Sequence, residues 1–469
     1  MTPKKKISKL IKKPLTQKKG IMKDMEPKPQ EKLVALPKGN LKEVRLVRGM
    51  KDIMPEDEKY WRHIYRTAES LADTAYFERI ETPIMEYTPI FSRAVGENTD
   101  IVEKEMFSFT DRGGDDVTLR PEGTAGVVRA YVEHGMINRP QPVKLWYFGP
   151  FFRYDRPQSG RQRQFYQFGC EVIGDSHPVI DAQMIAMASE FFKRLGLPVT
   201  LQVNSIGDKE SRVAYGRALM DFLKPHRHKI DKELLEHYKK TPLRLLDVKD
   251  EELQLILDNA PQIVDYLTPQ ANQHFVKVLE HLDELDVSYQ LNSKIVRGLD
   301  YYSHTTFEVM PDGADKKLHA LGGGGRYDKL VELFGGREDI GACGFALGIE
   351  RIITLMKEMN LPVPERKPPE VFLAQLGDKA RQKAIKILHE LQRAGFHVAE
   401  TFSKEALKSQ MEIANRLHVT FTLIIGQKEM IDDTVLIRDM ENGIQEVVDS
   451  RKIVAELRKR IGGTNGEHH

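Results

Sequence analysis

The stretch Ile295–Val309, IVRGLDYYSHTTFEV, is the most informative part of this chain. Arg297 precedes a glycine that permits a turn, and two adjacent tyrosines, Tyr301 and Tyr302, follow it. The β-branched and aromatic residues after them predict a strand over 305–309. Because side chains alternate along a strand, the two tyrosines are expected to face opposite sides unless a bulge re-aims one. An arginine and phenols at the mouth of a strand could hold an anion beside a small polar ring, whereas the simpler interpretation is a hairpin with two interface tyrosines.

Length and composition are typical of a globular protein without membrane spans. The chain has 469 residues, 40% of them hydrophobic and 30% charged, which predicts roughly two to four domains. It contains neither a run of ~18 apolar residues nor the apolar core of a signal peptide, so no membrane partner and a cytoplasmic location are expected. Cys170 and Cys343 lie far apart without metal-ligand spacing. We therefore expect two buried thiols and no zinc-type metal site.

The net charge of +2 conceals a basic N-terminal arm. Residues 1–50 carry a net charge of +11, which leaves −9 for the remainder. The first 23 residues hold nine lysines and no acid, so residues 1–43 are expected to be disordered. The arm either attracts nucleic acid or serves as a solubilising tail, and a transit peptide is disfavoured because such peptides are rich in Arg and Ser.

The two roles of this arm predict different results when it is removed. If the arm binds nucleic acid, deletion of residues 1–40 should weaken that binding and flatten its dependence on salt, because fewer counterions are released. An unchanged salt slope would reduce the arm to a solubilising tail.

The periodicity of residues 44–361 predicts one large domain of helices and strands. Apolar residues at intervals of three and four predict an amphipathic helix over 55–77. Short strand-like runs separated by tight turns favour an antiparallel sheet, with helices among them. Residues 209–285 are charged and helix-periodic, and are expected to form a helical insertion in this sheet. The other expected strands are 117–119, 144–152, 164–173 and 201–204, and the other expected helices are 124–132 and 179–195.

Residues 362–369, PVPERKPP, are rich in proline and predict a stiff linker and a domain boundary. Beyond it, residues 370–462 predict a second domain in which strands and helices alternate. This alternation is typical of a small α/β domain with a largely parallel sheet. Residues 463–469 are taken as a tail. The expected elements are strands 370–376, 397–401 and 420–425 and helices 379–394 and 404–417.

The stretch Phe151–Gly174, FFRYDRPQSGRQRQFYQFGCEVIG, predicts a hairpin rich in arginine. The planar fork of arginine matches phosphate oxygens, so the hairpin loop is a candidate phosphate site. Along the return strand, Phe165, Gln167 and Glu171 share one face by period two. Such a face could stack a base and hold a small polar ligand, and a solvated basic hairpin is the alternative. The four arginines are Arg153, Arg156, Arg161 and Arg163.

Two further segments carry candidate binding residues. In TLRPEGTA, Glu122 and Thr124 stand at the start of a predicted helix, where Thr124 is a candidate N-cap and the carboxylate could hold an ammonium group. In GFALGIERI, Arg351 occupies the first turn of a helix after a strand, where the helix N-terminus also favours phosphate. The run Gly322–Gly325 lacks the Lys-Ser/Thr of a P-loop, so a Walker-type NTPase is disfavoured.

These segments resemble the class II aminoacyl-tRNA synthetases over roughly residues 45–460. Glu81–Ile84 is similar to motif 1, the loop after Arg153 to motif 2, and GFALGIER to motif 3. VRGLDYYSHTTFEV and GGGRYD are similar to the two signatures of the histidyl-tRNA synthetases. The resemblance implies an α+β catalytic core with an antiparallel sheet, a helical insertion and a C-terminal α/β anticodon-binding domain. It also implies ATP-dependent ligation of L-histidine to tRNA(His) through a histidyl-adenylate, with Mg²⁺, in a homodimer assembled through motif 1.

The resemblance also implies a role for each candidate residue. Those implied to bind ATP are Arg153, Asp155, Phe165 and Arg351. Those implied to bind histidine are Glu122, Thr124, Gln167, Glu171, Tyr301 and Tyr302. Those implied to act on the reacting carboxylate and α-phosphate are Arg297, Arg161 and Arg153, and those implied to approach the tRNA acceptor end are Arg156 and Gln158. Two residues depart from the family pattern: Asp155 replaces the usual Glu of motif 2, which makes its contact to adenine less direct, and Lys329 replaces a small residue at the rim.

Two other functions stay open at this point. A non-catalytic, histidine-binding regulatory paralogue would share the core, but such proteins typically lack the anticodon domain and part of the arginine set, both of which this chain keeps. A synthetase for proline, threonine or glycine would share the anticodon-domain type. The Tyr301-Tyr302 signature argues against that second alternative.

Overall fold

The computed structural model describes residues 45–97, 99–155, 160–230, 238, 241–248, 250–312 and 320–464. The chain divides into two units, Met1–Arg48 and Gly49–His469. Only residues 45–48 of the first unit are described, so the predicted basic arm lies outside the described residues. Within the described ranges, no helix is both long enough and apolar enough to cross a membrane.

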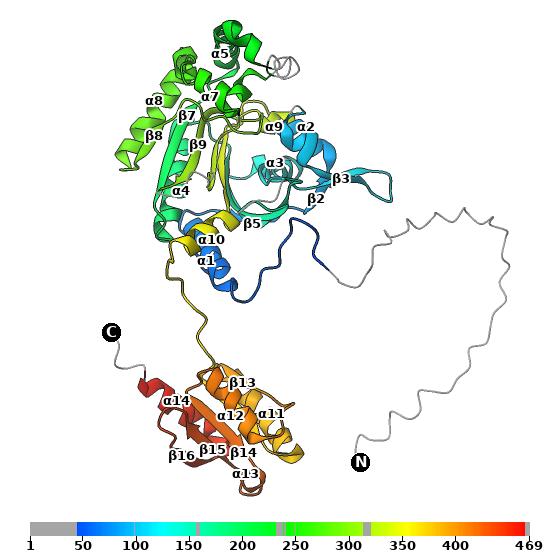
Figure 1. Ribbon diagram of the computed structural model, residues 1–469, viewed down its shortest axis with the longest axis vertical. Helices are drawn as coiled ribbons and strands as arrows, with labels where there is room; N and C mark the ends of the chain where they lie inside the picture. Colours follow the sequence, from blue (N-terminus) through cyan, green and yellow to red (C-terminus); the bar gives the residue numbers. More distant parts are fainter. Residues whose placement is uncertain are drawn as a thin grey trace, which may run out of the picture. The chain divides into compact units, whose positions relative to one another are not determined.

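An eight-stranded sheet forms the centre of the N-terminal part of the second unit (Figure 1). Its strand order is β1-β5-β6-β11-β10-β9-β7-β8. The six inner strands pair antiparallel, and the edge strands β1 and β8 pair parallel with their neighbours. The antiparallel sheet predicted from the sequence is thus confirmed. The strands are β1 Glu78–Arg79, β5 Val143–Phe152, β6 Gln164–Ile173, β7 Val199–Ser205, β8 Tyr289–Leu291, β9 Ser303–Pro311, β10 Gly322–Arg326 and β11 Ala342–Gly348.

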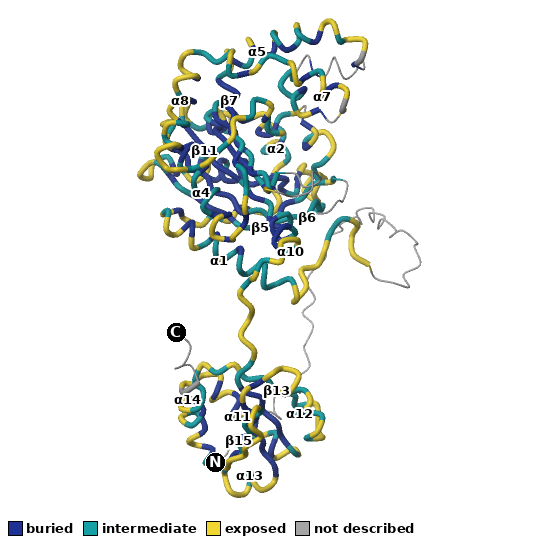
Figure 2. The backbone as a smooth tube through the Cα atoms, turned by 60° about the vertical axis from the view of Figure 1, so that its left-hand side comes forward, coloured by how far each residue is buried: buried dark blue, intermediate teal, exposed yellow. Residues whose placement is uncertain are grey.

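The two faces of this sheet belong to different apolar clusters, and β6 shows why. Phe168, Cys170 and Val172 pack in a cluster with α1, α4, α8 and α10, whereas Phe165 packs in the cluster that contains α2, α3 and α9. This alternation follows the period-two prediction for the strand. Figure 2 shows the buried residues gathered along these strands. The helices are α1 Glu58–Thr74, α2 Thr88–Val95, α3 Thr124–Glu133, α4 Pro178–Arg194, α8 Pro269–Glu284, α9 Leu330–Leu333 and α10 Ile349–Glu358.

The chain between β7 and β8 is mostly helical where it is described. Asp208, Asp250 and Thr268 each accept a hydrogen bond from a backbone amide in the first turn of the helix that follows, which fixes where those helices begin. This segment is the helical insertion that the fold class predicted. Its elements before α8 are α5 Lys209–Phe222, η4 Lys224–Lys229, η5 Pro242–Asp247, α7 Glu251–Leu257 and η6 Ile263–Tyr266.

A separate three-stranded sheet, in the order β2-β4-β3, follows the motif 1 segment. Thr82 of that segment is buried, and its carbonyl oxygen accepts a hydrogen bond of 2.8 Å from Arg120 Nη1. Ile84, Met85 and Phe109 nevertheless expose much of their apolar surface. The strands are β2 Met85–Tyr87, β3 Phe107–Thr110 and β4 Asp116–Leu119, and short helical turns occur at η2 Ile101–Glu105 and η3 Met136–Asn138.

The C-terminal part is built on a second sheet, in the order β13-β12-β14-β15-β16. The expectation of a largely parallel sheet is only partly right, because β15 and β16 are antiparallel. They form a hairpin whose turn contains Asn442 and Gly443, a signal that sequence reasoning overlooked. The elements are β12 Val371–Gln375, α11 Asp378–Arg393, β13 Val398–Glu400, α12 Leu407–Arg416, β14 Phe421–Ile425, α13 Gln427–Ile431, β15 Thr434–Asp439, β16 Gln445–Asp449, η7 Ser450–Lys452 and α14 Ile453–Thr464.

Candidate active site

A cavity of about 740 Å³ opens over one face of the central sheet, and we call it the central cavity. Strands β6, β9, β10 and β11 and the first turn of α10 contribute to its walls. Seven of the residues predicted from the sequence line it, although they come from three separate segments of the chain. They are Arg153, Asp155, Arg161, Phe165, Gln167, Arg297 and Arg351.

The arginines of the central cavity lie close enough to repel one another. Burial lowers the pKa of Arg351, and the charges of Arg161 and Arg153 lower it further. Arg153 is held by a 2.8 Å hydrogen bond from Nε to the carbonyl oxygen of Pro121, and its guanidinium lies 5.4 Å from the centre of the Phe165 ring. A cluster of fixed positive charges beside an aromatic ring suits a ligand that combines phosphates with a planar base.

Two buried polar atoms in the same cavity have no hydrogen-bond partner within the described part of the chain. They are Nε of Arg297 and Oε1 of Gln167. Arg297 forms an ion pair with Glu308 on β9 through Nη1, and this contact leaves Nε without a partner among the described residues. A Cβ at Gly323 would lie 3.0 Å from Arg297 Nη1 and 2.3 Å from the carbonyl oxygen of Phe307, so a glycine here keeps room for the guanidinium. Orphaned buried atoms of this kind commonly indicate a ligand site.

The motif 2 loop is described only at its two ends. Asp155 forms an ion pair with Arg161, and its backbone N–H donates to the carbonyl oxygen of Arg153 at 2.9 Å. The shorter acid therefore holds an arginine at the cavity wall. The predicted contacts of Arg156 and Gln158 with the tRNA acceptor end lie outside the described residues.

Next to the central cavity, a fully buried carboxylate accepts hydrogen bonds from three hydroxyl groups. Glu171 on β6 accepts hydrogen bonds from Tyr327 at 2.5 Å, Thr124 at 2.8 Å and Tyr147 at 3.3 Å. Burial raises the pKa of Glu171 to about 8, although these donors act in the opposite direction. A Cβ at Gly344 would lie 1.7 Å from Glu171 Oε2, so β11 needs a glycine opposite this carboxylate.

A second buried carboxylate, Glu122, stands at the start of α3. It accepts 2.8 Å hydrogen bonds from the backbone N–H groups of Thr124 and Ala125, and a third of 3.3 Å from Tyr301 Oη. The default interpretation of Thr124 as the N-cap is therefore wrong, because Gly123 occupies that position and Glu122 satisfies the amides. Burial raises the pKa of Glu122, while the two amide hydrogen bonds lower it.

Tyr301 and Tyr302 do not face opposite sides as the alternation argument predicted. Their ring centres lie 4.7 Å apart and both side chains are buried in one cluster. The reason is that β9 begins only at Ser303, so the tyrosines belong to the preceding turn, and His304 has a φ of 49°. The turn places the Tyr301 hydroxyl on Glu122, and the charges of Arg297 and Glu171 act on the phenol of Tyr302.

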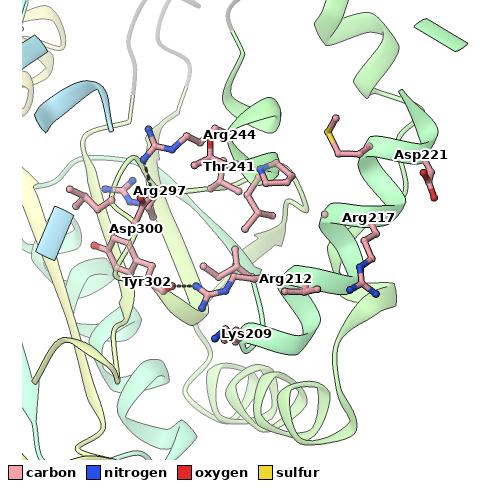
Figure 3. A pocket seen from close by; sticks show the side chains of 17 residues that line it. Lys209, Arg212, Arg217, Asp221, Thr241, Arg244, Arg297, Asp300 and Tyr302 are labelled. Atoms are coloured by element: carbon pink, nitrogen blue, oxygen red, sulfur yellow. Dashed lines mark hydrogen bonds and ion pairs between the residues drawn. The ribbon is translucent and has the colours of Figure 1, made fainter. Parts of the chain in front are cut away.

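The back of this turn borders another cavity of about 740 Å³, between α5, η5 and residues 296–302 (Figure 3). Arg212 on α5 donates a 2.7 Å hydrogen bond to the carbonyl oxygen of Tyr302, and Arg244 forms a 2.7 Å ion pair with Asp300. The helical insertion therefore holds the turn that carries Tyr301 and Tyr302.

Sequence reasoning missed three residues that contact the predicted set. Tyr327 was quoted only as part of GGGRYD, and Tyr147 and Glu308 were not singled out. Period two along β5 and β9 would have placed Tyr147 and Glu308 on the faces of those strands, but only the register with β6 and the position of Arg297 show what they touch.

The raised pKa of Glu171 predicts how stability depends on pH. In the unfolded chain this carboxyl ionises near its ordinary value of 4.5, whereas in the folded protein it ionises near 8. Between these values the folded state binds more protons, so its stability falls as pH rises. The Glu171→Gln variant lacks this titration, and its melting temperature should rise relative to the wild type between pH 5 and pH 8. The underlying free energy is on the order of a few kcal/mol. Calorimetry at several pH values checks this, and a pH-independent difference would contradict it.

Comparisons with known proteins fit this geometry. The family model described as histidyl-tRNA synthetase matches residues 49–352, and the model described as anticodon binding domain matches residues 370–460. A histidine–tRNA ligase of Dehalococcoides mccartyi is 43% identical over 417 residues, covering 88% of this chain and 99% of the relative. One from Listeria monocytogenes is 40% identical over 419 residues, covering 88% and 98%.

Two solved structures are informative. The apo histidyl-tRNA synthetase of S. aureus has a TM-score of 0.74 and 36% identity, covering 88% of this chain and 99% of that one. An ATP phosphoribosyltransferase regulatory subunit/histidyl-tRNA synthetase of Bacillus halodurans has a TM-score of 0.57 and 21% identity, covering 81% and 97%. The second likeness shows the fold alone.

Proposed function

Since the chain belongs to the histidyl-tRNA synthetase family, we propose that it ligates L-histidine to tRNA(His) at the central cavity, through a histidyl-adenylate. The overall reaction consumes ATP and releases AMP and pyrophosphate. One observation carries the assignment to this site: mutually repelling arginines line the cavity, and one of them, Arg153, also acts electrostatically on Glu122, one of the two buried carboxylates outside the cavity wall. The first set suits a nucleotide, and the second suits a small molecule with nitrogen donors.

Histidine is proposed to bind among the buried carboxylates. Glu171 would accept a hydrogen bond from the imidazole, and Glu122 would hold the α-ammonium group with Thr124 beside it. Tyr301, Tyr302 and Gln167 would complete the pocket. A buried carboxylate left without its donor is costly, so this arrangement would reject amino acids whose side chains lack a ring N–H.

ATP is proposed to bind along the arginines. The adenine would stack on Phe165, with Arg351 on its other side, and Arg153 would hold the α-phosphate. Asp155 would act mainly by holding Arg161, because the two side chains form an ion pair. The orphaned donor of Arg297 supports its placement on the reacting oxygens.

Activation is then an in-line transfer. A carboxylate oxygen of histidine attacks the α-phosphorus, a new P–O bond forms, and the bond to pyrophosphate breaks. Because guanidinium groups stay protonated, Arg153, Arg161 and Arg297 would stabilise the developing negative charge without moving a proton. The terminal ribose hydroxyl of tRNA next attacks the carbonyl carbon of the adenylate, and AMP leaves.

Mg²⁺ fits the chemistry of this cavity. The acidic residues Asp247, Glu308 and Glu350 are among those that line it, and oxygen ligands are those that Mg²⁺ prefers beside phosphates. When bound, the ion would neutralise charge on the β- and γ-phosphates. The protein residues would still orient the two reactants, because their contacts do not depend on the ion.

The partners and location are proposed from separate observations. The match of residues 370–460 to the anticodon-binding model supports tRNA as a partner. Exposed Ile84 in the motif 1 segment, with exposed Met85 and Phe109 in the small sheet that follows it, supports a homodimer through this region. Two free, buried cysteines support a reducing compartment such as the cytoplasm.

Aminoacylation with labelled histidine tests this function. Purified protein with ATP and Mg²⁺ should charge tRNA(His) and leave other tRNAs uncharged. A non-catalytic regulatory paralogue would bind histidine without charging any tRNA, and that result would overturn the proposal.

A further inference from the structure

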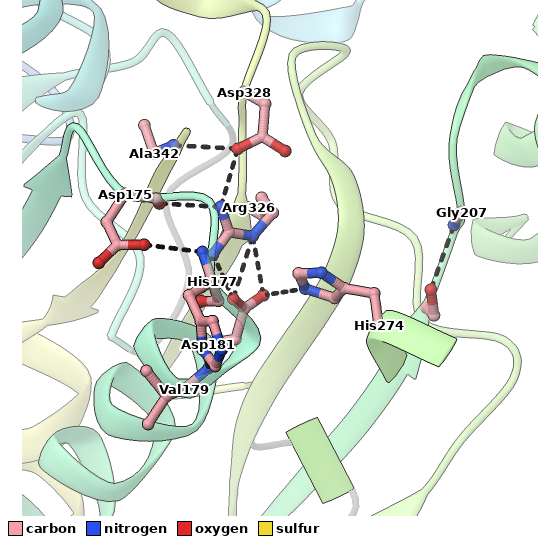
Figure 4. Close-up of polar contacts among 10 residues, drawn as sticks. Asp175, His177, Val179, Asp181, Gly207, His274, Arg326, Asp328 and Ala342 are labelled. Atoms are coloured by element: carbon pink, nitrogen blue, oxygen red, sulfur yellow. Dashed lines mark hydrogen bonds and ion pairs between the residues drawn. The ribbon is translucent and has the colours of Figure 1, made fainter. Parts of the chain in front are cut away.

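Arg326, the last residue of β10, has a fully buried side chain and yet makes a contact with each of its three nitrogens (Figure 4). Nε and Nη2 both donate to the carboxylate of Asp181 on α4, whose side chain is also fully buried. Nη1 donates to Asp328 Oδ1 at 2.9 Å. Carbonyl oxygens of Asp175 and His177 accept further hydrogen bonds of 3.2 Å each.

This arrangement depends on the planar fork of arginine. Five acceptor oxygens from four residues surround one guanidinium, which an ammonium group with a single nitrogen cannot match. Burial raises the pKa of Asp181, but the charge of Arg326 and hydrogen bonds from His274 and Arg326 lower it below its usual value. Both partners are therefore charged, and removing one would leave an uncompensated buried charge.

The next residue in the chain connects this ion pair to the proposed histidine pocket. Tyr327 donates its hydroxyl to Glu171, so Arg326 and Tyr327 point to different sides of the strand end. Tyr327 N–H donates to the carbonyl oxygen of Ala342 at 2.8 Å, and Asp328 Oδ1 accepts from Ala342 N–H at 3.0 Å. The guanidinium of Arg326 therefore links the two neighbours of Tyr327 in the chain, because it belongs to Arg326 and donates to Asp328.

The helical insertion joins the same network. His274 on α8 lies with Nε2 at 3.4 Å from Asp181 Oδ1, and its ring centre is 5.1 Å from that of His304 on β9. Asp181 thus receives contacts from β10 and from α8. Arg326, Asp181 and His274 thus come from three elements, β10, α4 and α8, and none of these three residues lines the central cavity.

We propose that Arg326, held by Asp181 and Asp328, is a positioning residue that fixes the Tyr327 hydroxyl on Glu171 and thereby sets affinity and selectivity for histidine. The inference rests on the proposed function of Glu171 and extends it to a network on the opposite side of the sheet. A role confined to stability would lower the melting temperature without affecting the two substrates differently.

The test compares Arg326→Lys with Tyr327→Phe in the full-length protein. Both variants should raise the KM for histidine about tenfold in ATP–pyrophosphate exchange, the cost of losing one buried hydrogen bond, and leave the KM for ATP within about twofold. Calorimetric titration with histidine should show the same weakening. Discrimination against a histidine methylated on a ring nitrogen should fall in both variants.

Met184→Ala provides a matched control for stability. Met184 is fully buried on α4, one turn from Asp181. It is not among the described residues that form hydrogen bonds with Glu171 or with Arg326. Its truncation should lower the melting temperature through a cavity but leave the KM for histidine unchanged. An Arg326→Lys protein that behaves like this control would overturn the proposal.

If the Arg326→Lys protein does not fold, the Asp328→Asn variant provides a second test of the same proposal. Asp328 is only partly buried, and this change weakens one of the contacts of Arg326 while leaving Asp181 in place. A selective rise in the KM for histidine supports the proposal, and unchanged or equally changed KM values for both substrates contradict it. If wild-type protein binds histidine but shows no exchange, the proposed function fails, whereas the inference is still decided by the binding titrations.

Discussion

Arg297→Ala is expected to reduce histidine-dependent ATP–pyrophosphate exchange by about 10²- to 10³-fold, the typical cost of removing one fixed donor to a developing anion. The guanidinium lies at the wall of the central cavity with its Nε lacking a partner in the described chain. Its loss should act mainly on kcat, because the charge that it stabilises develops in the transition state. Steady-state exchange kinetics at saturating histidine measure this directly.

Glu308 complicates this experiment and also offers its control. In Arg297→Ala, the Glu308 carboxylate loses its ion-pair partner and would repel the phosphates of ATP. The double variant Arg297→Ala, Glu308→Gln removes that repulsion, so any activity it regains measures the effect of the stranded carboxylate. Arg217→Ala, an exposed arginine in the neighbouring cavity, should keep wild-type exchange. Exchange near the wild-type rate in Arg297→Ala would show that this arginine has no catalytic role.

Glu171→Gln is expected to lower kcat/KM for histidine about 100-fold above pH 8, where the Glu171 carboxyl is ionised and the lost hydrogen bond is one to a charged group. The change keeps the shape of the side chain, so the packing of Tyr327, Thr124 and Tyr147 around it should survive. The KM for ATP should stay the same, because Glu171 lies outside the wall of the central cavity. Exchange assays with each substrate varied in turn provide both values.

A matched acid-to-amide change separates this effect from a general loss of charge. Glu190 lies on α4 in an exposed ion pair with Arg194, so Glu190→Gln should leave both KM values unchanged. If Glu171→Gln retained wild-type kcat/KM for histidine, recognition of the imidazole would have to be assigned to another group.

The sequence was sufficient to predict β5, β6, β7 and β9 of the central sheet. The strand over 164–173 agrees with β6 residue for residue, because apolar residues recur with period two at 166, 168, 170 and 172. It failed for β10, since a run of glycines has none of the side chains by which a strand is recognised. That strand forms where side chains must be absent, beside Arg297 and the neighbouring strands.

The sequence indicated which types of residue form the site, but it did not indicate which of their side chains contact one another. Arginines and tyrosines at the ends of strands indicated an anion and a small polar ring, and the structure brings the described ones together. The direction of Tyr301 and Tyr302 was not predictable, because it depends on where β9 begins and on a left-handed residue at position 304. The partners of Glu171 could not be predicted either, because Tyr147 on β5 and Tyr327 just after β10 approach it from segments far apart in the sequence.

The most direct test of this account is ATP–pyrophosphate exchange measured without tRNA for each of the twenty amino acids. The account predicts exchange with histidine alone, because its small imidazole ring offers an N–H to Glu171 while Glu122 holds the ammonium group, and the only other ring N–H, that of tryptophan, belongs to a larger two-ring side chain. Exchange with another amino acid, or none with histidine in protein that binds it, would contradict the account.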